Sequence, residues 1–217
     1  MAKRSKTLYG SGLELAEIEP LTRNQLVAFE SDKNLVLHGC AGTGKTFISC
    51  YLAFDDMTKN QYEKLVIIRS AVPTRDIGFL PGTEKEKSSV YEEPYYDISI
   101  DLFARGDAYQ ILKTKRLVHF MTTSYIRGIT LRDAVILIDE CQNMSFHELD
   151  SIITRVGENC RVIFCGDFSQ SDLKQNGMKE FFEILVSMNR FEFIEFGVED
   201  IVRSGFVKEY IIAKEYA

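Results

Sequence analysis

Eight residues near the N-terminus combine glycine, lysine and threonine at a spacing suited to holding phosphate. Residues 39–46 read GCAGTGKT and fit the pattern G-x-x-x-x-G-K-[ST] between a predicted strand at 34–39 and a predicted helix at about 45–58. Glycine permits positive φ, so successive backbone N–H groups can turn toward phosphate oxygens at a helix N-terminus. We therefore expect a nucleoside triphosphate site here; the alternative is a glycine-rich turn with an exposed lysine.

Two side chains of this loop have separate expected roles. Lys45 would reach the β- and γ-phosphates, and the Thr46 hydroxyl would ligate Mg²⁺. The six residues that precede Lys45 are also expected to surround the phosphates: Gly39, Cys40, Ala41, Gly42, Thr43 and Gly44.

A pair of acids follows a second apolar run. Asp139 and Glu140 come directly after AVILI at 134–138, which predicts that they lie at the end of a strand neighbouring the phosphate loop. Asp139 would hold Mg²⁺ largely through water, and Glu140 would polarise the attacking water. The pair predicts hydrolysis rather than binding alone, and the alternative is a strand that ends in solvated acids.

Three glutamines are further candidates. Gln142, and Gln170 in FCGDFSQSD at 164–172, follow buried strands, and an amide can donate to a phosphate oxygen while accepting from the lytic water. Turn chemistry also explains the 164–172 segment. Gln25 could pair with the adenine edge, but Thr22-x-x-Gln25 is equally a capping box at a helix start.

Composition limits the class of protein. The 217 residues are 45% hydrophobic and 27% charged, typical of one large globular domain, and no apolar run is long enough to span a membrane. The net charge of −6 argues against a generally basic nucleic-acid coat. Five cysteines without CxxC spacing, and three histidines, indicate reduced thiols in a cytoplasmic protein without a zinc site.

Strand and helix patterns alternate along the chain and predict a three-layer α/β domain with a mainly parallel sheet. We expect a short N-terminal segment at 1–20 and one domain at 21–217. Expected strands are 34–39, 64–69, 117–123, 134–139, 161–166 and 191–196, and expected helices are about 45–58, 95–113, 146–156, 177–189 and 206–216.

One long irregular connection is predicted at about 71–95, where three of the four prolines fall. It interleaves aromatic residues with lysines, a combination that suits single-stranded nucleic acid, yet its glutamates favour a subunit interface or a solvated loop equally. The residues concerned are Phe79, Tyr91, Tyr95, Tyr96, Lys85 and Lys87.

Together these motifs resemble the PhoH-like family of P-loop ATPases, whose domain is similar to the first RecA-like domain of superfamily 1 helicases. The matching pieces, in the family's order over about 20–214, are LTRNQ, GCAGTGKT, IIRSAV, IGFLPGTEKEK, YIRGITL, AVILIDECQN, FCGDFSQSDL and EDIVRSGFVKEYI. The chain has IIRSAV where many relatives have proline after the arginine, and RGIT where a further arginine is usual.

The resemblance implies ATP as the nucleotide, with Gln25 on adenine and with Gln142 and Gln170 as γ-phosphate sensors. It also implies a hexameric ring of this chain acting on RNA or single-stranded DNA. A lone RecA-like domain needs a cation from elsewhere to stabilise the transition state, and a neighbouring copy in a ring can supply it. Candidate arginine fingers are Arg127, Arg203 and Arg69, and the alternative for each is a solvated or internally paired arginine.

Two other functions fit parts of the pattern. A small-molecule P-loop kinase would need an arginine-rich lid, but Arg75 is the one arginine at 71–95, and Glu140 suits water better than a metabolite acceptor. A nucleotide-gated module that hydrolyses slowly and works through a protein partner fits the same site residues.

Overall fold

The computed structural model describes residues 6–70, 84–168 and 178–215. Its centre is a sheet of six parallel strands in the order β5-β4-β6-β7-β3-β8. The strands are β3 (Asn34–Gly39), β4 (Lys64–Arg69), β5 (Val118–Thr122), β6 (Ala134–Ile138), β7 (Cys160–Gly166) and β8 (Phe191–Phe196).

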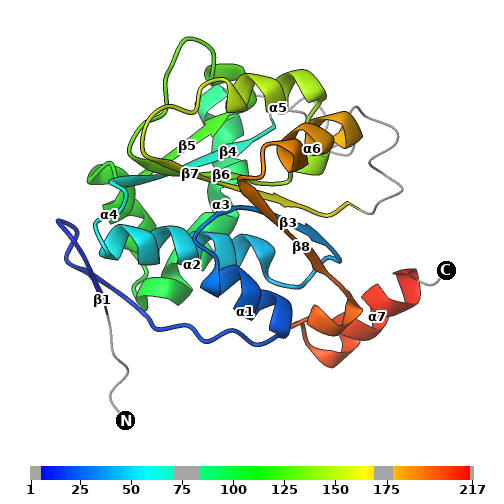
Figure 1. The fold of residues 1–217 in the computed structure, drawn as a ribbon. Coiled ribbons are helices and arrows are strands. Elements are labelled where there is room, and N and C mark those ends of the chain that lie inside the picture. Colours follow the sequence, from blue (N-terminus) through cyan, green and yellow to red (C-terminus); the bar gives the residue numbers. More distant parts are fainter. Residues whose placement is uncertain (1–5, 71–83, 169–177, 216–217) are drawn as a thin grey trace.

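Helices cover both faces of this sheet (Figure 1). On one face α1 (Arg23–Glu30), α2 (Lys45–Thr58), α3 (Glu84–Phe103) and α4 (Ala108–Thr114) contribute to one core, and α5 (Phe146–Ile153) and α6 (Met178–Ser187) contribute to the other. All five residues of β6 are buried, as expected for a strand with helices on both sides. The three-layer, mainly parallel α/β prediction is confirmed.

Peripheral elements complete the fold. β1 (Lys6–Leu8) and β2 (Leu13–Leu15) form an antiparallel hairpin, and an ion pair between Lys6 and Asp55 ties it to α2. The last helix, α7 (Gly205–Glu215), projects beside β8 in Figure 1. Within the described ranges, no helix combines the length and the apolar character needed to cross a bilayer.

Two predictions about α3 are wrong. The helix expected at 95–113 is two helices, α3 and α4, and the expected irregular connection at 71–95 is already helical from Glu84. Pro94 lies inside α3, although proline lacks an N–H and crowds the carbonyl four residues earlier. Tertiary packing outweighs this cost, because Tyr95 and Leu102 of the same helix are buried in the core.

Candidate nucleotide-binding site

The phosphate loop lies between β3 and α2, where the sequence predicts it. Gly39, which ends β3, has φ of 106°, and Gly44, the N-cap of α2, has φ of 84°. The loop is anchored to the chain's C-terminal part, because the Cys40 N–H donates to the Phe196 carbonyl at 2.8 Å and the Val202 N–H donates to the Gly42 carbonyl at 3.1 Å. The backbone N–H groups at the start of α2 are therefore presented on a fixed turn.

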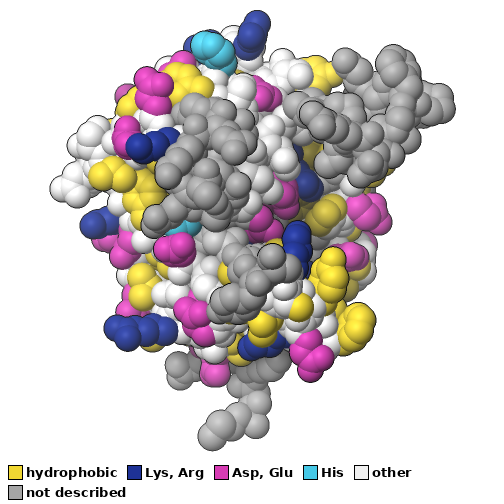
Figure 2. Space-filling view, turned by 90° about the vertical axis from the view of Figure 1, so that its right-hand side faces the viewer, with side chains coloured by type: hydrophobic (Ala, Val, Ile, Leu, Met, Phe, Trp, Pro, Cys, Tyr) yellow, Lys and Arg dark blue, Asp and Glu magenta, His cyan; other side chains and the backbone are white. Residues whose placement is uncertain are grey.

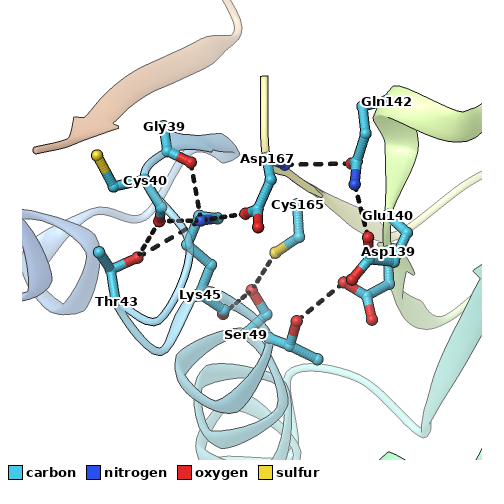
Figure 3. Close-up of polar contacts among 11 residues, drawn as sticks. Gly39, Cys40, Thr43, Lys45, Ser49, Asp139, Glu140, Gln142, Cys165 and Asp167 are labelled. Atoms are coloured by element: carbon cyan, nitrogen blue, oxygen red, sulfur yellow. Dashed lines mark hydrogen bonds and ion pairs between the residues drawn. The ribbon is translucent and has the colours of Figure 1, made fainter. Parts of the chain in front are cut away.

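Lys45 is buried and held by several oxygens (Figure 3). Its Nζ donates to the carbonyls of Gly39 and Cys40 at 3.1 and 2.7 Å and lies 2.5 Å from Asp167 Oδ1. Asp167 follows β7, and its side chain is 44% exposed. The Asp167 carboxylate therefore occupies the position beside the Lys45 ammonium that a bound phosphate would take.

This ion pair predicts that Asp167→Asn binds nucleotide more tightly than the wild type. A phosphate must displace Asp167 from Lys45, and an amide is a weaker competitor. Because Asp167 is nearly half exposed, solvent limits the pair to about 1 kcal/mol, so we expect a gain of about two- to fivefold. The measurement is the dissociation constant of a fluorescent ADP analogue at low and high salt.

Varying the salt concentration tests whether the gain in nucleotide affinity has an electrostatic cause. The gain should shrink at high salt, because screening already weakens the wild-type pair. Asp101→Asn on α3, an exposed position, is the control and should leave the affinity unchanged. A loss of affinity in Asp167→Asn would contradict the competition.

Asp139 lies beside the N-terminus of α2, but not on a strand neighbouring β3. β7 lies between β3 and β6, so the expectation of adjacent strands is wrong. The Thr46 hydroxyl in the first turn of α2 nevertheless donates to Asp139 Oδ1 at 3.0 Å. These hard oxygen donors, a hydroxyl and a carboxylate next to the phosphate loop, fit Mg²⁺.

Glu140, Gln142 and Asp167 form a chain of polar contacts (Figure 3). Gln142 Nε2 donates to Glu140 Oε2 at 2.6 Å, and Gln142 Oε1 accepts from the Asp167 N–H at 3.1 Å. Gln142 therefore connects the acid after β6 with the segment after β7. Glu140 has φ of 53°, a left-handed backbone that non-glycine residues seldom adopt and that is concentrated at functional sites.

The environment of Glu140 favours its neutral form. Burial raises the pKa of Glu140 above its usual 4.5, and neighbouring Asp139 raises the pKa further, while Arg69 and Gln142 oppose the shift. A raised pKa suits a carboxylate that must accept a proton from water.

The raised pKa predicts a stability difference that depends on pH. The unfolded chain ionises Glu140 at a lower pH than the folded chain does, so ionisation destabilises the fold as pH rises from about 4.5 through the raised pKa. Glu140→Gln removes this effect. We expect thermal unfolding of Glu140→Gln at a higher temperature than the wild type at about pH 8, with the gap closing toward pH 4.5. Equal unfolding temperatures at every pH would contradict the shift.

Gln25 is buried, and both the oxygen and the nitrogen of its side-chain amide form hydrogen bonds. Its Oε1 accepts from the Leu21 N–H at 2.7 Å, and its Nε2 donates to the Thr43 carbonyl at 3.1 Å. Half of the capping box is present, since the Thr22 side chain accepts from the Gln25 N–H. Gln25 therefore ties α1 to the phosphate loop, and its contact with adenine stays a prediction.

The three candidate arginines lie in different surroundings. Arg69 is half-buried, donates to the Tyr91 carbonyl at 3.3 Å and lies over the Tyr91 ring. Arg203 is exposed, and its Cγ would lie 3.0 Å from a Cβ added at Gly42, so it covers its own phosphate loop. Arg127 is exposed on the turn after β5. Gln170 lies outside the described residues.

Part of the expected nucleic-acid surface faces inward instead. Tyr95 is 1% exposed, and Tyr96 packs against Tyr109 with ring centroids 4.3 Å apart. Tyr91 lies under Arg69, and Phe79 is outside the described residues. These three tyrosines stabilise α3 against its neighbours, so they do not form an open stacking platform.

Sequence reasoning alone misses two residues of the site. In the sequence, Asp167 is explained as a residue that favours a tight turn. Its position directly after a buried strand could have indicated the contact with Lys45. Tyr95 donates to Asp139 Oδ2 at 2.6 Å, and burial together with Asp139 raises the pKa of this phenol, which keeps it a donor. No sequence signal indicates that contact, because Tyr95 falls within the expected irregular connection.

The glycine-rich turn between β3 and α2, with acids at the end of β6, gives the chain the fold of the P-loop nucleoside triphosphatase class. The chain belongs to the PhoH-like protein family, whose model matches residues 17–215.

Curated relatives from several bacteria agree with this assignment. Protein PhoH of Escherichia coli K12 is 32% identical over 195 residues, covering 85% of this chain and 55% of the relative. The PhoH-like protein of Bacillus subtilis is 31% identical over 201 residues, covering 90% of this chain and 63% of the relative. The chain therefore spans little more than half the length of these relatives.

Solved structures share the fold at low identity. The large terminase of a thermophilic bacteriophage is 14% identical with a TM-score of 0.57, over 88% of this chain and 50% of that one. A form of the same terminase in complex with ADP is 15% identical with a TM-score of 0.56, over 88% and 49%. These likenesses confirm the fold.

Proposed function

We propose that this chain binds ATP with Mg²⁺ and hydrolyses it. Two sets of contacts at the carboxyl edge of the sheet support this best. Thr46 donates to Asp139, and Asp167 and Gln142 link Lys45 to Glu140. Family membership and the ATPase fold agree with it.

Each residue has a role that follows from its position. Backbone N–H groups at the start of α2 and the Lys45 ammonium bind the phosphates, and Thr46 and Asp139 would hold Mg²⁺, which would supply neutralising positive charge there. Glu140 accepts the proton of the attacking water, and its raised pKa matches that task. Gln142 orients Glu140 and couples it to Asp167.

The proposal includes a ring of identical chains, a hexamer in the family that the sequence resembles. Arg127 is our candidate finger. Arg203 is equally exposed but lies against the phosphate loop of its own chain, and Arg69 is half-buried against Tyr91. A neighbour's arginine would stabilise negative charge in the transition state.

We also propose that hydrolysis serves action on RNA or single-stranded DNA in the cytoplasm. The support is the resemblance of the family's domain to a helicase domain. Figure 2 views the side from which α7 projects in Figure 1, and acidic and basic side chains are interspersed there. Contacts with the phosphates of a nucleic acid would therefore be limited to a few basic side chains at a time.

The first test measures phosphate release from ATP with and without Mg²⁺, and with and without single-stranded RNA or single-stranded DNA, over a range of protein concentrations. We expect Mg²⁺-dependent release that rises more steeply than the protein concentration and increases with RNA. Absence of release would contradict the ATPase proposal. Release unaffected by any nucleic acid would contradict the nucleic-acid part and favour the switch that works through a protein partner.

Mixing two inactive variants tests the finger. Arg127→Ala retains Glu140, and Glu140→Gln retains Arg127, so a mixed ring contains complete sites if the arginine acts on a neighbour. Partial recovery of hydrolysis on mixing supports Arg127 as the finger. Hydrolysis that stays at the level of the separate variants contradicts it.

A further inference from the structure

Asp139 is held from two sides by two different helices. Its Oδ1 accepts from the Thr46 hydroxyl of α2 at 3.0 Å, and its Oδ2 accepts from the Tyr95 hydroxyl of α3 at 2.6 Å. Asp139 and Tyr95 are 3% and 1% exposed, so water does not compete freely for these contacts. The two carboxylate oxygens therefore have distinct partners.

The Tyr95 ring cannot easily move away from this contact. Its centroid lies 5.9 Å from that of Phe120 on β5. One turn earlier in α3, the Tyr91 carbonyl accepts from Arg69, and buried Glu92 pairs with Lys113 of α4 at 2.8 Å. Contacts with β4, β5 and α4 therefore fix the part of α3 that presents the hydroxyl.

We propose that Tyr95 is a positioning residue that sets the rotation of the Asp139 carboxylate and leaves Oδ1 directed at Thr46, where Mg²⁺ would be held. The inference rests on the proposed function. The terminal torsion of aspartate is broad, so a carboxylate without this partner samples other rotations. Hydrogen-bond partners behind a metal ligand typically change metal affinity by about 10- to 100-fold.

The test replaces Tyr95 by Phe, which removes the hydroxyl and keeps the ring against Phe120. The readout is the Mg²⁺ concentration that gives half of the Mg²⁺-dependent increase in affinity for a fluorescent ADP analogue. We expect this concentration to rise about tenfold in Tyr95→Phe. Affinity in the presence of EDTA should match the wild type, because the phosphate loop is untouched.

Tyr109→Phe is the matched control. Tyr109 is also a buried tyrosine whose hydroxyl donates to a carboxylate, that of Glu92 at 3.4 Å, in the same helical layer. Loss of the Tyr109 hydroxyl should leave unchanged the Mg²⁺ concentration that gives half of the increase in affinity. Should Tyr95→Phe fail to fold, Phe120→Leu loosens the ring and keeps the hydroxyl, and we expect a smaller rise of about two- to threefold, below the range for losing the partner.

The outcomes separate this inference from the function on which it rests. A Mg²⁺ concentration equal to that of the wild type would overturn the positioning role and leave the proposed ATPase intact. An equal loss of nucleotide affinity with and without Mg²⁺ would show that Tyr95 has only a structural role, and this result would also overturn the positioning role. A wild type that binds nucleotide independently of Mg²⁺ would overturn the positioning role together with the Mg²⁺ site on which it rests, whereas phosphate release from ATP tests hydrolysis separately.

Discussion

We expect Glu140→Gln to lower the rate of the proposed ATP hydrolysis by about 10²- to 10⁴-fold, the usual loss when a general base is removed. The amide cannot accept the proton of the attacking water, yet it has nearly the shape of the carboxylate and can still meet Gln142. Binding should therefore survive, with ATP affinity within about twofold of the wild type, since Lys45 and Thr46 are untouched.

Steady-state phosphate release and equilibrium binding of ATP together check this expectation. Glu180→Gln makes the same chemical change at an exposed position in the first turn of α6 and should keep full activity. More than about a tenth of wild-type activity in Glu140→Gln would exclude Glu140 as the base.

Gly39→Ala destabilises the fold by about 3–5 kcal/mol. A Cβ at this position would lie 2.3 Å from the backbone oxygen of Phe196, which is its neighbour across the β3–β8 pair, and φ is 106°. Backbone strain costs about 1–3 kcal/mol and steric overlap a similar amount. Backbone atoms of a paired strand cannot move aside cheaply, so the two costs add.

Urea denaturation followed by circular dichroism measures the free energy of unfolding. Gly106→Ala is the matched control, because nothing lies within 4 Å of a Cβ there, and we expect a change within about 0.5 kcal/mol. A loss below about 1 kcal/mol for Gly39→Ala would show that β8 can separate from β3 at this end.

Local sequence predicted much of the fold and the centre of the site. Short runs rich in aliphatic and aromatic residues identified all six strands of the sheet, and several of these runs are apolar at consecutive positions because both faces of the strand are buried. GCAGTGKT, Asp139 and Glu140 were recognisable because each role requires a particular residue type next to a strand end. Thr46 and Asp139 do lie within hydrogen-bond distance, as their shared role requires.

The remainder depends on contacts between distant parts of the chain. Strand order is not encoded locally, so β7 between β3 and β6 could not be foreseen. Pro94 suggested an irregular segment, whereas packing of Tyr95 and Leu102 makes that segment helical. The contacts of Asp167 with Lys45 and of Tyr95 with Asp139 join residues far apart in sequence, and neither follows from spacing.

The place of β7 in the sheet has a consequence for how freely this sequence can diverge. The strands that lead to the phosphate loop and to Asp139 are two strand spacings apart, about 10 Å, and backbone hydrogen bonds set that interval. Side chains along β7 fill the layers above and below without defining the interval. Substitutions that preserve volume at the buried apolar positions 162–165 of β7 can therefore accumulate while the two halves of the site keep their separation.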